Sequence, residues 1–300
     1  MLAEVVTALQ PRAGGRHADG TVGGGGHAAA ILKASAPNGW LFGCDRDGAA
    51  LEAAAGRLAE FVGRFELRRG NFSELADWIE PESCDGVLLD LGVSSPQLDE
   101  AERGFSFQQD GPLDMRMDRE QPLTAARLVN ETAEEELARI FRELGEEREA
   151  RRLARVIVEE RRLRRFETTR QLAKLIERVV RRPGSRLHPA TRVFQALRMA
   201  VNDELGSLRR GLAAALKILK PGGRLAVITF HSLEDRAVKE FGREHARDYA
   251  VMGRLDVPEL RQPVRPKTKW VERKAMPPRA DEVAANPRAR SAQLRVLEKI

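Results

Sequence analysis

The sequence is poor in cysteine and contains no long hydrophobic run. Cys44 and Cys84 are the only cysteines among 300 residues, and no CxxC pair occurs. Two buried, reduced thiols are therefore expected rather than a disulfide. No apolar segment approaches the ~20 residues needed to span a bilayer, and the start of the chain lacks the features of a signal peptide. We expect a cytoplasmic protein that makes no membrane contact.

Metal-binding patterns and hydride-transfer acids are also missing from the sequence. The five histidines are scattered, with no HExxH motif and no Cys/His cluster, so we expect no metal site. Tyr249 is the only tyrosine, and Gly253 stands where a Tyr-x-x-x-Lys pair would place its lysine. The sequence therefore offers no such pair to a nicotinamide-dependent oxidoreductase.

Basic residues, and arginine above all, are in excess. Lysine and arginine together number 51 against 45 acidic residues, which gives a net charge of +6 and a pI near 9.7. Guanidinium groups form forked hydrogen bonds to phosphates and bases, so this charge favours a polyanionic partner such as RNA. An arginine-rich composition is also typical of GC-rich genomes, so the charge alone does not decide the function.

The pattern of apolar residues changes twice along the chain. The first hundred residues alternate short apolar runs with helical patterns, which is typical of βαβ units and a parallel sheet. Strands are predicted at residues 40–44 and 84–89, with an alanine-rich helix at 48–61 between them. Long, arginine-rich helices are predicted from about 132 to 204, and strand character returns at 224–230.

These changes predict an α/β protein with an inserted helical domain. The α/β domain would comprise residues 1–110 and 206–300, and the insertion residues 111–205. Residues from about 258 to 287 are rich in proline and basic side chains and are predicted to form a long, partly ordered loop. The alternating pattern at 291–299 predicts an edge strand.

Helix-capping residues mark two helices of the predicted insertion. Thr132 with Glu135 predicts a capping box, and Thr169 is predicted to cap a further helix that Pro183-Gly184 would end. The arginines of residues 148–165 could follow the phosphates of an RNA. Alternatively, they form a solvated helix face in ion pairs with neighbouring glutamates.

A glycine-rich segment is the first sign of a ligand site. The segment DGTVGGGGH at residues 19–27 lies between a short predicted strand and the helical residues 28–32. Glycines at that position let the backbone turn tightly and approach a ligand closely. Asp45 ends the next predicted strand, where an acidic residue commonly accepts hydrogen bonds from ribose hydroxyls.

NAD and S-adenosylmethionine are both bound by this arrangement, so other segments must separate them. The turn KPGG at 220–223 feeds a late strand and resembles the turn before the fifth strand of class I methyltransferases. The segment LLDLGVSSP at 88–96 places polar groups where methyltransferases hold the acceptor atom. Strand ends of this kind border the ligand crevice of an open α/β sheet.

Several longer motifs resemble those of the MraW family of bacterial 16S ribosomal RNA (cytosine-N4) methyltransferases. They run in the family's order along most of the chain: Asp90–Asp99, Glu102–Phe107, Asp110–Asp118, His188–Ala196, Phe230–Arg236 and Asn286–Ser291. One departure is visible. The family usually has a His-x-Pro-Val segment before the residues that match Leu2-Ala3-Glu4, and this sequence does not contain it.

The resemblance implies a fold, a cofactor and a substrate. The fold would be a class I (Rossmann-like) methyltransferase sheet with an inserted all-helical domain, and the cofactor S-adenosylmethionine. The activity would be methylation of the exocyclic N4 of a cytosine in the decoding region of 16S rRNA, with the small ribosomal subunit as partner. Carried over by matching motif, the cofactor contacts are Gly25, Gly26, His27, Asp45, Phe72, Asp90 and Gln97.

The acceptor nitrogen of cytosine is a poor nucleophile, because its lone pair is delocalised into the ring. Hydrogen-bond acceptors that engage its protons favour the reactive geometry, and Ser94 and Ser95 are our candidates. Alternatively, both serines only shape their loop. Phe105 and Phe107 could stack on a flipped base, although at alternating spacing one is as readily a core residue.

Methylation at carbon-5 of cytosine is disfavoured because it needs a cysteine thiolate that attacks the ring. Cys44 adjoins Asp45 and is expected beside the cofactor ribose. Cys84 precedes Asp90 by a strand length of roughly 20 Å at about 3.3 Å per residue. His231 could act as a base, but the residues after it also predict a capping box, Ser232 with Asp235.

Two further functions remain open at this stage. A different RNA methyltransferase that uses S-adenosylmethionine would share the same motifs. A non-catalytic RNA-binding protein would keep the basic charge but would not need an intact glycine segment and Asp45. The oligomeric state, the exact nucleotide and the choice between naked RNA and an assembled subunit are not determined by the sequence.

Overall fold

The computed structural model describes residues 1–180, 184, 188–251 and 257–300, and these residues form two compact units. Unit 1 comprises Met1–Gly92 and Leu205–Ile300, and unit 2 comprises Val93–Glu204. The first boundary therefore lies at residues 92–93, whereas we expected it at 110–111.

A seven-stranded sheet with the order β3-β2-β1-β4-β5-β9-β8 forms the centre of unit 1. Its strands are β1 (Arg16–Asp19), β2 (Trp40–Asp45), β3 (Phe65–Arg69), β4 (Cys84–Asp90), β5 (Leu219–Thr229), β8 (Thr268–Trp270) and β9 (Gln293–Lys299). The first five strands pair in parallel, and β9 runs antiparallel to both of its neighbours. This is the predicted α/β class, a Rossmann-like sheet.

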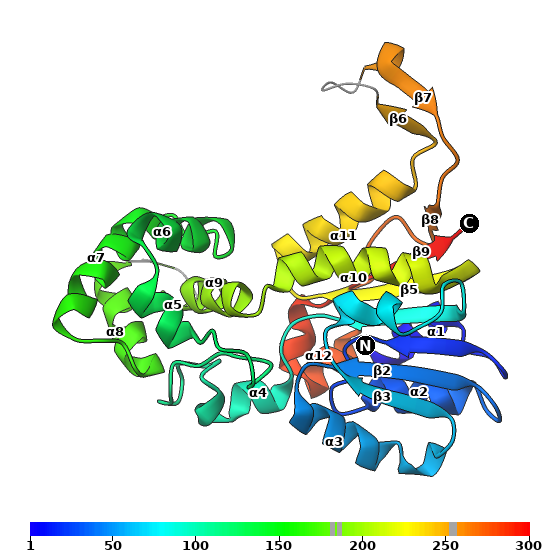
Figure 1. Cartoon of the computed structure of the whole chain (residues 1–300), viewed down its shortest axis with the longest axis horizontal. Coiled ribbons are helices and arrows are strands. Elements are labelled where there is room, and N and C mark those ends of the chain that lie inside the picture. The colour runs from blue at the N-terminus through cyan, green and yellow to red at the C-terminus, as the bar shows by residue number, and fades with distance from the viewer. Residues whose placement is uncertain (181–183, 185–187, 252–256) are drawn as a thin grey trace. The chain divides into compact units, whose positions relative to one another are not determined.

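Helices cover both faces of this sheet (Figure 1). They are α1 (Leu2–Leu9), α2 (Gly26–Ala34), α3 (Gly48–Arg57), α10 (Glu204–Ile218), α11 (Ser232–His245) and α12 (Ala280–Ala285). Alternate strand residues point to opposite faces, so Leu89 and Val227 pack with α10 and α11, while Leu88 and Ala226 pack with α1 and α2. Burial on both faces explains why the parallel strands read as continuous apolar runs.

The C-terminal part of unit 1 is more ordered than the sequence suggested. Residues 258–287, which we expected to be a long loop, contain β8 and α12, and also β7 (Arg261–Pro263). β7 pairs with β6 (Tyr249–Val251) in a hairpin that extends away from the sheet in Figure 1. Strands of three residues are too short to show an alternating pattern. Because β8 could not be predicted, β9 was predicted to be the edge strand. In the structure β8 pairs with β9 and takes the edge position.

Unit 2 is all-helical and has its own core. Its helices are α4 (Ser95–Asp99), α5 (Ala125–Glu131), α6 (Glu134–Glu143), α7 (Ala150–Leu163), α8 (Thr169–Val179) and α9 (Thr191–Val201). Phe141 and Leu153 are fully buried where α6 packs on α7. Phe105 belongs to the same core, which explains why residues 93–110 fold with unit 2. Among the described residues, none of the helices has the length and hydrophobicity of a membrane span.

The helix caps lie one residue away from the predicted positions. Ala133 precedes α6, and Thr132 instead ends α5. At α8 the capping box is formed by Thr168 and Gln171, because the residue three positions after Thr169 is an apolar leucine. This helix ends at Val179, and Pro183, which we expected to end it, lies outside the described residues.

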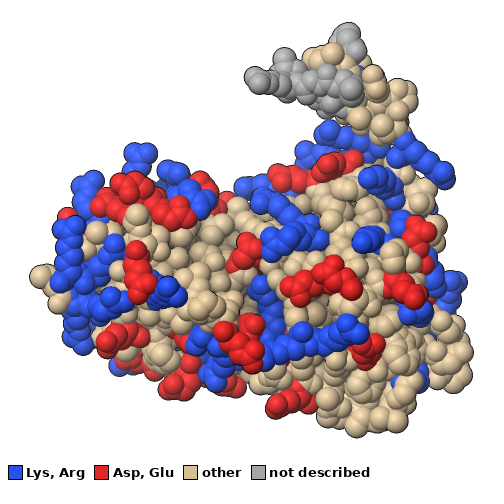
Figure 2. Space-filling view, viewed as in Figure 1, with Lys and Arg blue, Asp and Glu red and all other residues tan. Residues whose placement is uncertain are grey.

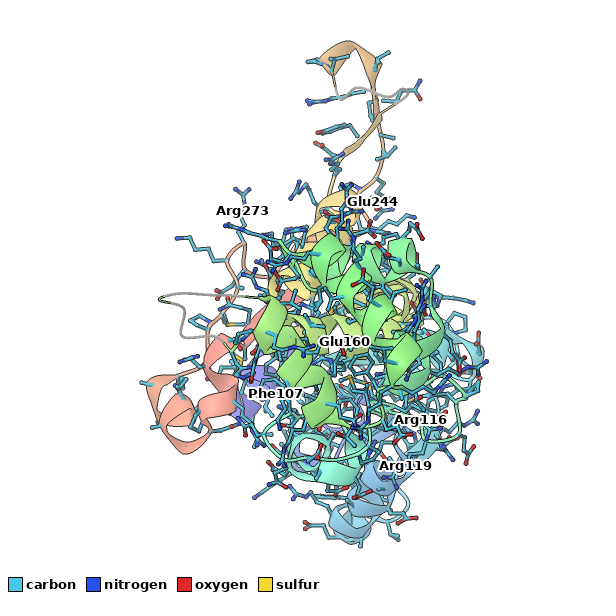
Figure 3. The ribbon with its side chains drawn as sticks, turned by 90° about the vertical axis from the view of Figure 1, so that its left-hand side faces the viewer. Phe107, Arg116, Arg119, Glu160, Glu244 and Arg273 are labelled. Atoms are coloured by element: carbon cyan, nitrogen blue, oxygen red, sulfur yellow. The ribbon has the colours of Figure 1, made fainter. Side chains whose placement is uncertain are left out.

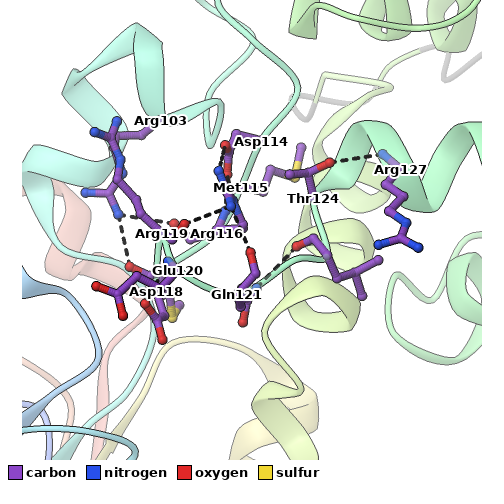
Figure 4. Close-up of polar contacts among 12 residues, drawn as sticks. Arg103, Asp114, Met115, Arg116, Asp118, Arg119, Glu120, Gln121, Thr124 and Arg127 are labelled. Carbon is purple, nitrogen blue, oxygen red and sulfur yellow. Dashed lines mark hydrogen bonds and ion pairs between the residues drawn. The ribbon is translucent and has the colours of Figure 1, made fainter.

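Two arginines organise the loop that contains the Asp110–Asp118 motif (Figure 4). The Arg116 guanidinium donates to both Asp114 oxygens at 2.8 Å and to the carbonyl oxygens of Arg119 and Gln121. Arg103, which is 5% exposed, donates to the carbonyl oxygens of Arg116 and Met117. Arg103 and Arg116 therefore satisfy backbone carbonyls of this loop.

Candidate active site

Three carboxylates stand at the carboxyl ends of neighbouring strands in unit 1. β1 ends at Asp19, β2 at Asp45 and β4 at Asp90, and the three strands are adjacent in the order β2-β1-β4. Ligands of open α/β sheets bind in the crevice at this edge.

The glycine-rich segment connects β1 to α2 at this same edge, as predicted. Gly23 and Gly25 adopt left-handed conformations with φ of 49° and 78°. A Cβ at Gly20 would lie 2.7 Å from side-chain atoms of Leu89 and Phe72, whereas one at Gly24 would meet nothing within 4 Å. Gly20 is thus required for packing, and Gly24 borders open space that a ligand can approach.

Asp45 links the glycine segment to the end of β2. Its carboxylate accepts hydrogen bonds from the backbone N–H of Gly23 and of Asp47, both at 2.9 Å. Burial raises the pKa of Asp45 above its ordinary value, and these two donors act against the shift. A carboxylate has about four acceptor positions, and the backbone N–H groups around Asp45 do not fill all of them, so it can still accept from a ligand's hydroxyl group.

Asp19 and Asp90 are joined through Thr21. The Thr21 N–H donates to Asp19 Oδ1 at 3.1 Å, and the Thr21 hydroxyl oxygen accepts from the Asp90 N–H at 2.6 Å. Asp19 Oδ2 and Asp90 Oδ1 are buried and have no hydrogen-bond partner within the described residues. Burial raises the pKa of each carboxyl group to about 7.

His27 lies in the first turn of α2 and faces Asp90. Its Nδ1 is 3.5 Å from Asp90 Oδ2, and its buried Nε2 has no hydrogen-bond partner in the part of the chain described here. Burial lowers the pKa of His27 to about 4, so the imidazole is neutral at neutral pH. A neutral ring can donate one hydrogen bond and accept another.

The negative charge of the three carboxylates favours a cationic ligand over an anionic one. Buried carboxylate oxygens without partners are costly, and a ligand that brings a positive charge and hydrogen-bond donors would relieve that cost. A pyrophosphate group would instead add negative charge beside Asp19, Asp45 and Asp90. The site therefore fits a cationic nucleoside better than a dinucleotide such as NAD.

Phe72 is held at the same edge by close packing. A Cβ on Gly211 of α10 would lie 2.3 Å from the Phe72 ring, so this glycine makes room for it. Asn71, just before Phe72, donates from Nδ2 to the Ser207 hydroxyl at 2.8 Å. Phe72 is half-buried, and its Cβ lies against Gly20, which places the residue beside the glycine segment.

The remaining predicted residues, Ser94, Ser95 and Gln97, belong to α4 in unit 2. Gln97 Oε1 accepts from the Ser94 N–H at 3.0 Å, and Ser94 Oγ accepts from the Gln97 N–H at 3.5 Å. These two oxygens therefore form the capping box of α4. Ser95 is exposed and makes no side-chain hydrogen bond within the described residues, so its hydroxyl is available to a ligand.

Three other candidates have structural contacts. Phe105 is a core residue, while Phe107 is half-buried, stacks on His188 at 4.5 Å and is labelled in Figure 3. The capping box of α11 is formed by His231 and Glu234, and Glu234 accepts a hydrogen bond from the His231 N–H. We had predicted Ser232 as the capping residue. The base role of His231 gains no support from this arrangement.

Three of the five arginines of α7 (Arg152, Arg155 and Arg161) have partners in the described residues, as does Arg165 just beyond the helix. Arg161 donates to the carbonyl oxygens of Val129 and Thr132 at 2.9 and 2.7 Å, at the carboxyl end of α5. Arg165 pairs with Glu131 at 3.1 Å. Figure 2 shows basic and acidic side chains interspersed on the visible face of this helical unit. This pattern resembles a solvated face with ion pairs more than a continuous basic track.

A model of the MraW methylase family matches residues 1–300. The chain belongs to this family. The similar proteins include three named Ribosomal RNA small subunit methyltransferase H. The one from Symbiobacterium thermophilum is 53% identical over 307 residues, which is 100% of this chain and 95% of that protein. Those from Syntrophotalea carbinolica and Geobacter sulfurreducens are each 53% identical, covering 99% and 100% of this chain and 96% and 97% of theirs.

This member of the MraW family is a methyltransferase whose cofactor is S-adenosylmethionine. The donor carries a sulfonium and an ammonium group. These positive charges are the kind of partner that the buried oxygens of Asp19 and Asp90 lack within the described residues. Asp19 was not among the predicted contacts, although it begins the quoted glycine motif. Asp19 could have been predicted from its place at the end of a strand, directly before Gly20, which packs closely against Leu89 and Phe72.

Proposed function

We propose that this MraW-family protein transfers a methyl group from S-adenosylmethionine to the exocyclic N4 of a cytosine in the decoding region of 16S rRNA. Relatives over the full length of the chain are named as methyltransferases of small-subunit ribosomal RNA. The observation that favours N4 over carbon-5 is that both cysteine thiols are buried, so neither is placed to attack the base.

Carbon-5 methylation would need a reactive thiolate. Cys44 Sγ donates to the Gly70 carbonyl at 3.1 Å, and burial raises the pKa of this thiol to about 12. Cys84 begins β4, at the end of the sheet opposite Asp90, and burial raises the pKa of its thiol to about 11. Neither thiol is ionised at neutral pH, whereas attack by N4 needs no covalent adduct.

The residues of unit 1 bind and orient the donor in this proposal. Asp45 accepts hydrogen bonds from the ribose hydroxyls, and Gly25 and Gly26 let the backbone approach the ligand. Asp90, with His27 beside it, faces the cationic part of the donor. Phe72 provides an apolar surface for the adenine ring.

Gln97 and the two serines act from α4. Gln97, whose side-chain oxygen caps α4, remains a proposed contact of the donor. Ser94 and Ser95 are the proposed acceptors for the N4 protons, and Ser95 has the free hydroxyl. S-adenosylmethionine supplies an activated methyl group, so catalysis rests mainly on alignment and on the exclusion of water.

The transfer balances without another reactant. The sulfur–methyl bond breaks as the N4–methyl bond forms, and S-adenosylhomocysteine leaves as a neutral thioether. One N4 proton then passes to a hydrogen-bond acceptor and on to water. Methyl transfer to a different RNA position by the same donor site is the second candidate function.

Nucleoside analysis of the product tests the proposal. Small ribosomal subunits from a strain that lacks this enzyme would be incubated with the protein and methyl-labelled S-adenosylmethionine. We expect the label in N4-methylcytidine within a decoding-region fragment. Label in 5-methylcytidine, or in another RNA segment, would overturn the proposed position.

A further inference from the structure

A basic groove lies on unit 1 between α11 and the β8–β9 edge. Its cavity has a volume of about 450 Å³. It is lined by five basic side chains and one indole together with two small or neutral residues: Lys239, Arg243, Arg273, Lys274, Arg295, Trp270, Ala275 and Gln293. Within the described part of the chain, no carboxylate lines the groove.

The positive charge of the groove is only partly balanced by the protein. Asp235 pairs with Lys239 at 3.5 Å and also with Arg295 at the groove floor. Arg243, Arg273 and Lys274 are exposed, and none of them has an ion-pair partner among the described residues. In Figure 3 Arg273 projects away from the ribbon. Like charges gathered without counter-ions repel one another, which a polyanion in the groove would relieve.

Trp270 gives the groove an aromatic wall. A Cβ on Gly242 of α11 would lie 2.1 Å from the indole, so this glycine lets the ring press against the helix. The guanidinium of Arg295 lies 5.8 Å from the centre of the indole. Basic side chains that follow a phosphate backbone, combined with an aromatic ring that can stack on a base, are the usual features of single-stranded RNA sites.

One end of the groove, at Gln293, lies at the same sheet edge as the donor site, while Trp270 pairs with Leu297, four residues further along β9. Gln293 of β9 pairs with Thr229, the last residue of β5, and Asp90 of β4 pairs with Ile228 of β5. Gln293 and Asp90 are therefore two strands apart, about 10 Å at a spacing of roughly 4.8 Å per strand. An RNA strand that leaves the groove at Gln293 would reach the donor edge within a few nucleotides.

We propose that this groove is the docking site for the substrate RNA strand next to the target cytosine. The inference rests on the proposed function, because it takes ribosomal RNA to be the substrate. Phosphates contact Arg243, Arg273 and Lys274, and a base stacks on Trp270.

A charge-removing variant tests the groove directly. The triple variant Arg243→Gln, Arg273→Gln, Lys274→Gln removes three exposed charges that have no structural partner. The matched control Lys33→Gln, Arg209→Gln, Lys217→Gln removes three exposed charges from α2 and α10 of unit 1 that likewise have no ion-pair partner among the described residues. A transcript of the 16S decoding region is titrated at several salt concentrations, and S-adenosylmethionine binding is measured by calorimetry.

We expect the groove variant to bind the transcript at least about tenfold more weakly at low salt. The slope of log affinity against log salt should flatten by about two for three lost contacts to a single strand. Affinity for S-adenosylmethionine should not change, and the control should match the wild type. A separate titration with polyglutamate should show at most weak binding.

Each other outcome has its own meaning. Equal losses in the two variants would show a general charge effect and overturn the groove. Unchanged RNA binding by the groove variant, with methylation intact, would overturn the groove but keep the proposed function. Tight binding of polyglutamate that the groove variant loses would assign the groove to an acidic protein instead. A wild-type protein that neither binds nor methylates the transcript or the assembled subunit would contradict the proposed function itself.

Discussion

The two units use their buried polar side chains in opposite ways. In unit 2, Arg103 and Arg116 donate to carbonyl oxygens of their own loop, and Asn202 donates to Met115 and accepts from Met117. In unit 1, Asp19 and Asp90 each keep a buried oxygen with no partner in the described residues. The comparison indicates that these polar residues of unit 2 stabilise the fold, whereas the carboxylates at the sheet edge are suited to bind a ligand.

The largest expected effect is the loss of a structural arginine in unit 2. Arg161→Glu removes two hydrogen bonds to carbonyl oxygens and sets a carboxylate against the end of α5, at a cost of about 2–4 kcal/mol. Arg162→Glu, the exposed neighbour on α7, should change the free energy of unfolding by less than about 0.5 kcal/mol. Denaturant unfolding measures both. Equal effects of the two changes would contradict the structural role of Arg161.

Asp45→Ala should reduce cofactor binding but leave unit 1 folded. Ribose hydroxyls would lose their acceptor, at about 1–3 kcal/mol or roughly ten- to a hundred-fold in affinity for S-adenosylmethionine. Asp77→Ala, which removes an exposed carboxylate from the same unit, is the control. Calorimetry with circular dichroism checks binding and folding together. An Asp45→Ala protein that is folded and binds normally would remove Asp45 from the site.

An effect of comparable size is expected from pH. The pKa of Asp19 and of Asp90 is about 7 in the ligand-free protein, and a cationic donor prefers them ionised. Affinity for S-adenosylmethionine should therefore rise by about tenfold per carboxylate between pH 6 and 8.

The stability of the ligand-free protein should change with pH in the other direction. A raised carboxyl pKa stabilises the fold below its unfolded value near 4, and that contribution is lost as pH rises through about 7. Affinity that is flat with pH, in a protein whose stability also does not move, would contradict the assignment of these two pKa values.

The smallest effect is expected at the thiols. Cys44→Ser, Cys84→Ser should keep methyl transfer within a few-fold of the wild type, because neither thiol serves in the proposed chemistry. Turnover on small subunits, normalised to bound cofactor, is the measurement. Loss of turnover in a double variant that still folds and binds cofactor would favour attack by a cysteine.

The α/β class and the place of the glycine segment could be predicted from the sequence, because both rest on local patterns. Parallel strands buried on two faces read as apolar runs, and the glycine segment lies between a strand and a helix. The exact caps at Thr168 and His231 were missed by one residue, since two polar residues stand side by side at each helix start. Only the residue with Gln or Glu three positions later closes the box.

Other features depend on contacts between distant segments and could not be predicted. Asp19 appeared as the border of a motif, and its unpartnered oxygen is visible only once β1 lies beside β4. The basic groove joins α11 to β8 and β9, which are separated by the hairpin in sequence. The role of Arg161 likewise depends on the end of α5, about thirty residues earlier in the chain.

The most direct test of the account compares ligands at the buried carboxylates. Affinities of the wild type and of Asp19→Asn for S-adenosylmethionine and for NAD would be measured by calorimetry at pH 8. We predict that the wild type binds S-adenosylmethionine and not NAD, and that Asp19→Asn weakens the binding by about tenfold or more without loss of thermal stability. Comparable binding of NAD, or unchanged affinity for S-adenosylmethionine in a folded Asp19→Asn protein, would contradict the claim that these carboxylates hold a cationic methyl donor.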